Sequence, residues 1–234
     1  TARGNYTEGQ FARFYLGSST TPYTVTVNAS HSIAGTWASH VAGQTITISD
    51  AGSGTGSLSI ASGLQGFLTT GPLVINCPLT GPGGISHQQS ASLALNATNS
   101  YAGGTATTGC QLIYYNNSYA FGTGTFTVGG TSDAIINSSG QALNLTNKFA
   151  FSGSYDFNLA GGNAVGGHPG TTISGTVSLP ASGLVLLNTS SGATQVMAIS
   201  NVISGAGASL EISDNGTLIL AGTNTYKGVT SVGA

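Results

Sequence analysis

Short segments in which apolar and hydroxyl-bearing residues alternate recur along the whole chain. Residues 23–27 read Y-T-V-T-V, and the same alternation returns at residues 45–49 and 57–60. Successive side chains of a β-strand point to opposite faces, so this period of two predicts strands with one buried face. No window carries apolar residues at the i, i+3, i+4, i+7 spacing of an amphipathic helix. The pattern therefore predicts an all-β protein.

The same reading places strands over most of the chain, separated by irregular runs of Gly, Ser, Thr and Asn. An apolar strand at residues 72–77 is followed by turn residues, and residues 149–160 carry aromatic residues at period two. Residues 28–43 are the least regular part, and we expect a cap or an excursion loop there. Further strands are expected at residues 11–16, 134–137, 142–146, 171–179, 183–187, 195–199 and 209–213.

Two distant segments share one pattern. Residues 92–109 read S-L-A-L-N-A-T-N-S-Y-A-G-G-T-A-T-T-G, and residues 217–234 read T-L-I-L-A-G-T-N-T-Y-K-G-V-T-S-V-G-A. Aligned without a gap, both contain two alternating leucines, then Thr-Asn-x-Tyr and then Gly-x-Thr. A shared spacing of this length indicates a degenerate internal repeat.

The pattern L-x-L-x-x-T-N-x-Y-x-G-x-T resembles the passenger-associated repeat of bacterial autotransporters, which lies in long parallel β-helix stalks outside the cell. The resemblance covers the two segments and is compositional elsewhere. The second copy departs from it at Val229, where a second glycine is usual, and the first at Asn96 and Ala97. It implies a secreted, extracellular protein at the cell surface. The corner residues of the repeat would be Asn99, Tyr101, Asn224 and Tyr226.

Repeat, glycine content and variable turn lengths together favour a right-handed parallel β-helix, that is, a β-solenoid with irregular coil lengths. The chain of 234 residues contains 37 glycines, which suit tight corners. A β-sandwich would also give short strands with frequent turns, and it is the alternative fold. Asn at a coil corner tolerates a left-handed backbone, and stacked amides can hydrogen-bond along a solenoid.

Charge is scarce. Only 4% of the residues are charged and the formal net charge is −2, whereas about a quarter of residues are charged in an average domain. The four basic residues are scattered, so we expect no nucleic-acid partner. No apolar run approaches the roughly 18 residues of a membrane-spanning helix. The basic residues are Arg3, Arg13, Lys148 and Lys227.

The titratable residues do not form a recognisable catalytic or metal-binding pattern. The six carboxylates are dispersed, and the one close pair, Glu211 and Asp214, is better explained as turn chemistry. The four histidines lack metal-ligand spacing on one element, and we expect them in solvated loops. We therefore predict no enzyme activity, no metal and no cofactor. The histidines are His31, His40, His87 and His168.

Two smaller features leave alternatives open. Cys77 and Cys110 are the only cysteines, so they are either two buried thiols or one disulfide between neighbouring coils. Glycan binding needs exposed aromatic residues on one face. The best candidates are Tyr114, Tyr115 and Tyr119, although the first two point to opposite faces of any strand.

The repeat pattern also predicts how the ends of the chain behave. In the family a further strand follows the second copy, and residues 9–18 resemble that strand. We divide the chain into an N-terminal arm and first strand (1–18), exchanged with a neighbouring subunit, and a solenoid body (19–234). The predicted self-association residues are Phe11, Phe14, Tyr15, Leu16, Leu218, Leu220, Tyr226, Val229 and Val232.

The expected function is that of a structural subunit of an extracellular filament, sheath or surface layer. Copies would join head-to-tail through their open solenoid ends, because a coil without a neighbour exposes unpaired backbone and core. The alternative is a stalk fragment of an autotransporter-type adhesin that binds host or glycan surfaces.

Overall fold

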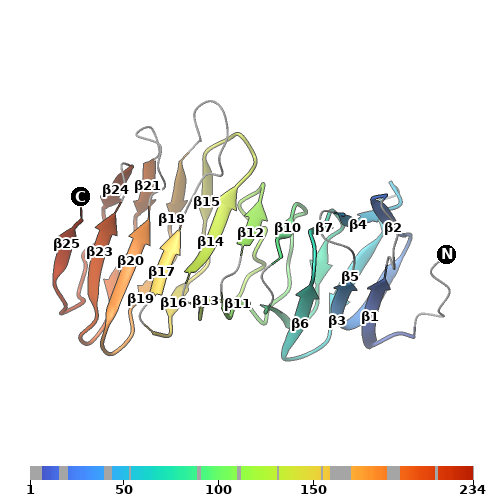
Figure 1. The fold of residues 1–234 in the computed structure, drawn as a ribbon, viewed down its shortest axis with the longest axis horizontal. Helices are drawn as coiled ribbons and strands as arrows, with labels where there is room; N and C mark the ends of the chain where they lie inside the picture. Colours follow the sequence, from blue (N-terminus) through green and yellow to red (C-terminus); the bar gives the residue numbers. More distant parts are fainter. Residues whose placement is uncertain are drawn as a thin grey trace.

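The protein is a stack of parallel β-coils. The structure, a computed structural model, describes residues 7–15, 21–39, 44–52, 54–88, 91–109, 112–130, 132–153, 155–158, 170–188, 196–213 and 216–233. These residues form an all-β solenoid of about 8 turns. Figure 1 shows an elongated body with β1 and β25 at opposite ends. The predicted parallel β-solenoid is confirmed, and the antiparallel β-sandwich alternative is wrong.

Three sheets line the solenoid. Sheet A contains β1 (Gln10–Tyr15), β3 (Ser30–Ser39), β5 (Ser57–Ile60), β6 (Leu64–Thr69), β8 (Leu79–Thr80), β9 (Gly84–His87), β11 (Thr105–Thr107), β13 (Phe126–Val128), β16 (Phe149–Phe151), β19 (Val177–Ser178) and β22 (Ile203–Ser204). Sheet B contains β2 (Tyr23–Val27), β4 (Ile46–Asp50), β7 (Leu73–Ile75), β10 (Leu93–Leu95), β12 (Leu112–Tyr115), β14 (Ser132–Asn137), β17 (Tyr155–Asn158), β20 (Leu184–Asn188), β23 (Ser209–Ser213) and β25 (Thr230–Val232). Sheet C contains β15 (Leu143–Leu145), β18 (Thr171–Ile173), β21 (Val196–Ile199) and β24 (Thr217–Leu220).

The period of two places alternate residues in columns inside the solenoid. In sheet B the column Ile48, Ile75, Leu95 and Tyr115 runs through paired positions of four consecutive coils, and all four are buried. Residues between them, such as Val74, are half-buried on the outer face. Burial of each large apolar side chain contributes about 1.5–3 kcal/mol, so the column supplies much of the driving force for stacking.

Coil length varies while register is kept. Leu73 pairs with Leu93, a step of 20 residues, whereas Thr36 pairs with Phe67, a step of 31 residues. The paired positions stay in register, so the columns of side chains are kept. This variation explains why the sequence shows no fixed repeat period.

An aromatic cluster fills the core in the middle of the stack. The ring of Phe121 lies 5.2 Å from that of Tyr115 and 4.9 Å from that of Phe126, which stacks on Phe149 at 5.0 Å. Around this cluster the repeat changes its position relative to the sheets. The first repeat copy starts in sheet B with β10, whereas the second starts in sheet C with β24.

Two sequence predictions about strands need correction. Residues 28–43 were expected to form a cap or loop, yet they contain β3, a ten-residue strand that pairs with β1, β5 and β6. Gly35, at a φ of 126°, interrupts the alternation of inward and outward side chains along β3, so the sequence does not show a regular period of two there. The expected strand at 149–160 is broken after Phe151, and β17 pairs in a different sheet from β16.

Several glycines are required because consecutive coils touch through their backbones. A Cβ on Gly83 would lie 1.7 Å from the carbonyl oxygen of Ala61 in the preceding coil. By contrast, a Cβ on Gly66 would meet nothing closer than 3.6 Å. The backbone of Ala61 cannot move away as a flexible side chain could, so position 83 tolerates only glycine.

We expect Gly83→Ala to lower the free energy of unfolding by about 3 kcal/mol, because the methyl group forces two coils apart. Gly66→Ala is the matched control and should change it by less than about 0.5 kcal/mol. Urea unfolding followed by far-UV circular dichroism measures both. Equal stabilities for the two variants would contradict the close approach of the coils.

Candidate functional site

The asparagines of both repeat copies hold the preceding coil in the same way. The Oδ1 of Asn99 accepts a hydrogen bond from the backbone N–H of Leu79 at 2.8 Å. The Oδ1 of Asn224 accepts one from the backbone N–H of Ile203 at 2.9 Å. Leu79 and Ile203 are each the first residue of a strand, so the side chain satisfies a backbone donor where the strand begins.

The tyrosine, glycine and threonine of the repeat complete the corner. The hydroxyls of Tyr101 and Thr105 lie 2.6 Å apart, and those of Tyr226 and Thr230 are also hydrogen-bonded. A Cβ on Gly103 or on Gly228 would overlap the backbone of the preceding coil. We call these two sets the internal corner motif, Leu93, Leu95, Asn99, Tyr101, Gly103 and Thr105, and the C-terminal corner motif, Leu218, Leu220, Asn224, Tyr226, Gly228 and Thr230.

Stacked amides do occur along the solenoid, but at other positions than expected. The Nδ2 of Asn96 donates to the Oδ1 of Asn76 in the preceding coil at 3.0 Å. Asn117, in the coil that follows Asn96, donates to the carbonyl oxygen of Asn96 at 3.1 Å. The corner asparagines Asn99 and Asn224 bond to backbone instead.

The two corner motifs differ in what covers them. A following coil covers the internal motif: β12 pairs with β10, β13 pairs with β11, and the Nδ2 of Asn99 donates to the carbonyl of Ala120 at 2.7 Å. Within the described part of the chain, β24 and β25 are the last strands of their sheets. The Nδ2 of Asn224 therefore has no partner among the described residues.

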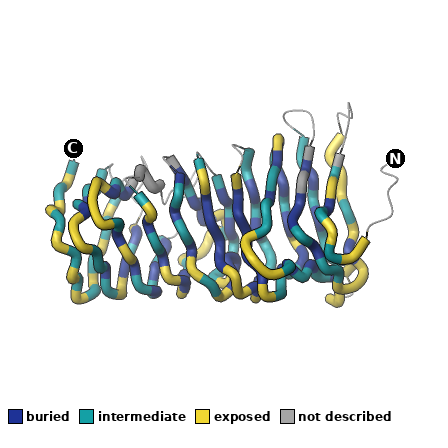
Figure 2. Tube along the Cα trace, turned by 90° about the horizontal axis from the view of Figure 1, so that it is seen from below, coloured by how far each residue is buried: buried dark blue, intermediate teal, exposed yellow. Residues whose placement is uncertain are grey.

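Exposure reflects this difference directly. Tyr101 is 0% exposed, whereas Tyr226 is half-buried. Thr107 is 1% exposed, whereas Val232 at the equivalent position is 80% exposed. Figure 2 shows buried residues throughout the stack and mostly half-buried or exposed residues in the C-terminal coil. Among the described residues, no strand continues sheets B and C beyond the C-terminal motif.

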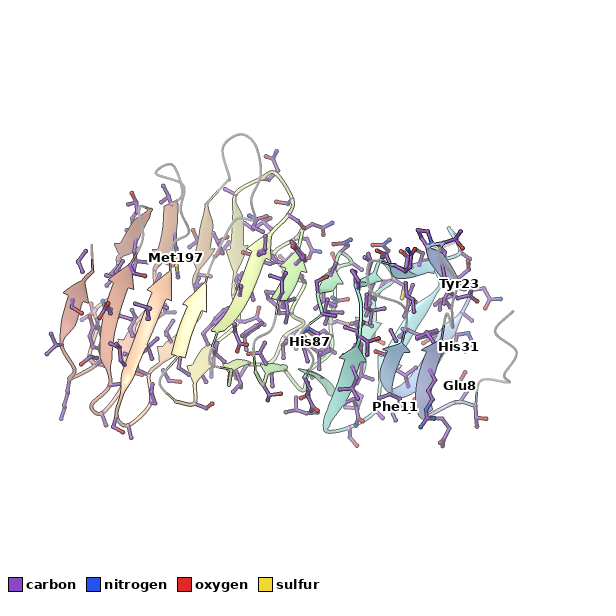
Figure 3. The ribbon with its side chains drawn as sticks, viewed as in Figure 1. Glu8, Phe11, Tyr23, His31, His87 and Met197 are labelled. Carbon is purple, nitrogen blue, oxygen red and sulfur yellow. The ribbon has the colours of Figure 1, made fainter. Side chains whose placement is uncertain are left out.

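The opposite end of the stack is a hollow. A cavity of about 480 Å³ opens between β1 and β2, and apolar side chains form most of its wall. Figure 3 shows Phe11, Tyr23 and His31 around this end of the molecule. Its apolar lining residues include Phe14, Val25, Val27, Ile33, Ile48 and Leu58.

Glu8 secures the outer edge of β3 at this end. Its carboxylate receives a hydrogen bond from the backbone N–H of Ser32 (2.5 Å) and pairs with the His31 Nδ1 (2.6 Å). The bond with His31, and next the bond from Ser32, lower the pKa of Glu8. The side chain of Glu8 is 57% exposed, so it orders the edge without forming a buried ion pair.

The predicted self-association residues gather at the two ends and not in one site. Phe11 and Phe14 lie at the N-terminal cavity, and β1 pairs with β3 of its own chain. Leu218 and Leu220, in the last strand of sheet C, pack partly against the core, whereas Val229 is 69% exposed. The side chain of Tyr15 and all of Leu16 lie outside the described residues.

The three tyrosines predicted to contact a glycan differ in their exposure to solvent. Tyr115 is 1% exposed, its hydroxyl lies 2.7 Å from that of Thr171, and burial raises its pKa. Tyr115 is a core residue, so it is not available for contact with a glycan. Tyr114 is half-buried on the outer face, and Tyr119 is 58% exposed in the turn after β12.

The cysteine prediction rests on one described residue. Cys77 is fully buried and forms no disulfide with any described residue. Burial raises its pKa to about 11, which keeps the thiol protonated at neutral pH. Cys110 lies outside the described residues, so the disulfide stays a prediction.

Sequence reasoning missed a buried polar column. His87, expected in a solvated loop, is fully buried in β9, where its ring nitrogens face the carbonyls of Phe67 (3.1 Å) and Ala91 (3.0 Å). Thr107 lies beside it in the next coil and donates to the buried carboxylate of Asp133. The backbone N–H of Gly130 donates to the same carboxylate oxygen at 2.8 Å. The period of two could have placed His87 inside.

The described residues hold no group of three or more His, Cys, Asp or Glu side chains arranged to bind a metal. In the same part of the chain, no helix has the length and apolar character needed to cross a membrane. His40, His168 and Asp214 lie outside the described residues. No family model, curated protein or solved structure matches this chain.

The two corner asparagines should differ in their contribution to stability. Asn99→Ala removes hydrogen bonds to both neighbouring coils and leaves buried backbone groups unpaired, so we expect a loss of about 2–4 kcal/mol in the free energy of unfolding. Asn224→Ala removes one bond at a half-exposed corner, and we expect a loss of about 1 kcal/mol. Chemical denaturation measures the free energy of unfolding of both variants. Equal losses would contradict the conclusion that a described coil covers Asn99 and that none covers Asn224.

His87 should make stability depend on pH. Burial is the main cause that lowers its pKa below the ordinary value of 6.5, against the opposing effects of the two carbonyls and Asp133. The unfolded chain then binds a proton more readily, so stability falls as pH drops below about 6.5. Urea titrations at pH 8 and pH 5 should show this fall in the wild type and a smaller one in His87→Gln. Greater stability at pH 5 would mean that His87 is held as an imidazolium.

Proposed function

We propose that this protein is a structural subunit of an extracellular filament, sheath or surface layer, in which copies join head-to-tail. The observation that supports this proposal is that both ends of the described stack present apolar side chains beside strand edges. At one end the cavity between β1 and β2 is lined by Phe14, Val25 and Ile33. At the other, Val229 and Val232 are exposed, and Leu218 and Leu220 are half-buried.

The direction of the strands selects the mode of association. The described strand pairs are parallel, so a C-terminal edge placed on an N-terminal edge would continue sheet B, from β25 to β2, with all strands in the same direction. Two identical ends facing each other would place their strands antiparallel. The contact of a C-terminal edge with an N-terminal edge is heterologous, and a heterologous contact that does not close into a ring extends into a filament.

The surface chemistry suits a structural role. Charged residues make up only 4% of the chain, so the stacked copies meet little long-range repulsion. The side walls carry mainly small and hydroxyl-bearing residues, and the inner columns are continuous along the stack. Such a rod gains stability from each added coil, as repeat proteins do.

A stalk of an autotransporter-type adhesin is the second candidate. The repeat pattern supports it through its resemblance to the passenger-associated repeat. Tyr119, exposed in a turn on the side of the rod, and half-buried Tyr114 would be its contact residues for a host or glycan surface. This candidate requires no association between copies.

Negative-stain microscopy of the full chain at increasing concentration separates the two candidates. We expect filaments whose length grows with concentration, and their loss in Phe14→Asp, which places a charge in the N-terminal cavity. Leu184→Asp, at a 40% exposed position on the side wall, is the control and should leave filaments intact. Uniform short rods from the wild type at every concentration would contradict the filament proposal and favour the adhesin stalk.

A further inference from the structure

The outer face of sheet B carries two columns of side chains in the middle of the stack. Paired positions from β4 to β14 form a mainly apolar column, which consists of Thr47, Val74, Ala94, Tyr114 and Ile136. Two residues further along each coil, a polar column follows, which consists of Ser49, Asn76, Asn96, Asn116 and Ser138. A strip of apolar side chains thus runs along the stack beside a strip of amides and hydroxyls.

The chain of hydrogen bonds in the polar column stops between Asn96 and Asn116. The Nδ2 of Asn96 donates to the Oδ1 of Asn76 at 3.0 Å, and the Oδ1 of Asn116 accepts from Asn117 at 3.2 Å. Among the described residues, the Oδ1 of Asn96 and the Nδ2 of Asn116 have no partner. Both asparagines directly follow paired residues of β10 and β12, and neighbouring strands lie about 4.8 Å apart. One free acceptor and one free donor therefore lie side by side on neighbouring coils.

A free donor beside a free acceptor matches the hydroxyl groups of a sugar ring. A hydroxyl both donates and accepts, so one sugar hydroxyl can donate to Asn96 while its neighbour accepts from Asn116. The carbon–hydrogen face of a pyranose ring is apolar and packs on aromatic and aliphatic side chains. Half-buried Tyr114 lies two residues before Asn116, and half-buried Val74 and Ala94 precede it in the same column. A sugar ring on this face would place its apolar side on one column and its hydroxyls on the other.

The charge of this face favours an uncharged ligand. Neither column contains a carboxylate or a basic side chain. Asp50, at the end of β4, accepts hydrogen bonds from backbone N–H groups of the glycine-rich turn that follows it. Asp133, in β14, is buried. A sulfated or carboxylated glycan would find no charge-assisted hydrogen bond on either column.

The regular spacing of the columns favours a linear polymer. Successive coils repeat the face every 4.8 Å or so, a distance comparable to the length of one pyranose ring. Successive rings of an extended chain could therefore make equivalent contacts along the stack. A flat chain with equatorial linkages offers apolar faces and hydroxyl edges along its whole length, whereas a helical chain turns them away.

We propose that the outer face of sheet B between β4 and β14 binds a linear, uncharged polysaccharide along the stack. Asn96 and Asn116 bond to its hydroxyls, and Tyr114 packs on a sugar ring. This inference rests on the second candidate function, the adhesin stalk, and gives that candidate a class of ligand.

Isothermal titration calorimetry of the full chain with cellohexaose, a flat uncharged oligosaccharide, tests this face. Asn116→Asp keeps the oxygen that accepts from Asn117 and replaces the free donor by a charged acceptor, so the affinity should fall about tenfold. Tyr114→Thr removes the ring, keeps a residue that suits a strand, and should also weaken binding about tenfold. Asn201→Asp, at an exposed corner elsewhere in the stack, is the matched control and should bind as the wild type does. Far-UV circular dichroism checks that each variant keeps the fold.

The uronic-acid analogue of cellohexaose, with a carboxylate on every ring, tests the requirement for an uncharged ligand. It should bind about tenfold more weakly, and equal or tighter binding would overturn the uncharged class. Binding of cellohexaose that neither Asn116→Asp nor Tyr114→Thr weakens would overturn this face and leave the adhesin candidate standing. A wild type that binds neither oligosaccharide would overturn the inference, and filaments seen by microscopy would then still support the structural role.

Discussion

Stacking of one coil on the next is the interaction on which this structure depends. A single coil cannot satisfy its own backbone groups or bury its inward side chains, because a parallel strand finds its hydrogen-bond partners only in adjacent strands. Each column of side chains, such as Ile48, Ile75, Leu95 and Tyr115, exists only as part of a stack. Every coil therefore needs a neighbour on each side, and among the described residues β24 and β25 are paired on one side alone.

The corner motif carries the specificity of this stacking. Side-chain columns tolerate many apolar residues, whereas the corner asparagine, tyrosine and threonine bond to defined atoms. Asn99 reaches both neighbouring coils, and Asn224 makes the lower contact alone. The same small set of residues thus builds both the interior of the stack and the last described coil. In the proposed assembly one more coil would be placed on that last coil.

The sequence predicted the class of fold because the period of two and the repeat are local patterns. Residues 23–27, 57–60 and 209–213 form strands with the predicted bounds. It could not predict β3, because Gly35 shifts the alternation, nor the change of sheet between the repeat copies, which follows from coil lengths in the middle of the chain. At the candidate site, the corner residues could be found by alignment. Their partners could not, because Leu79 and Ala120 lie about 20 residues away in coils of unequal length.

Hydrogen exchange at different protein concentrations tests the central claim most directly. If a second copy covers the C-terminal coil, backbone amides of β24 and β25 gain protection as concentration rises, while amides of central strands such as β10 keep a constant, high protection. Exchange at β24 and β25 that is fast and independent of concentration would contradict the account. The C-terminal corner motif would then be an open edge with no copy of this chain upon it.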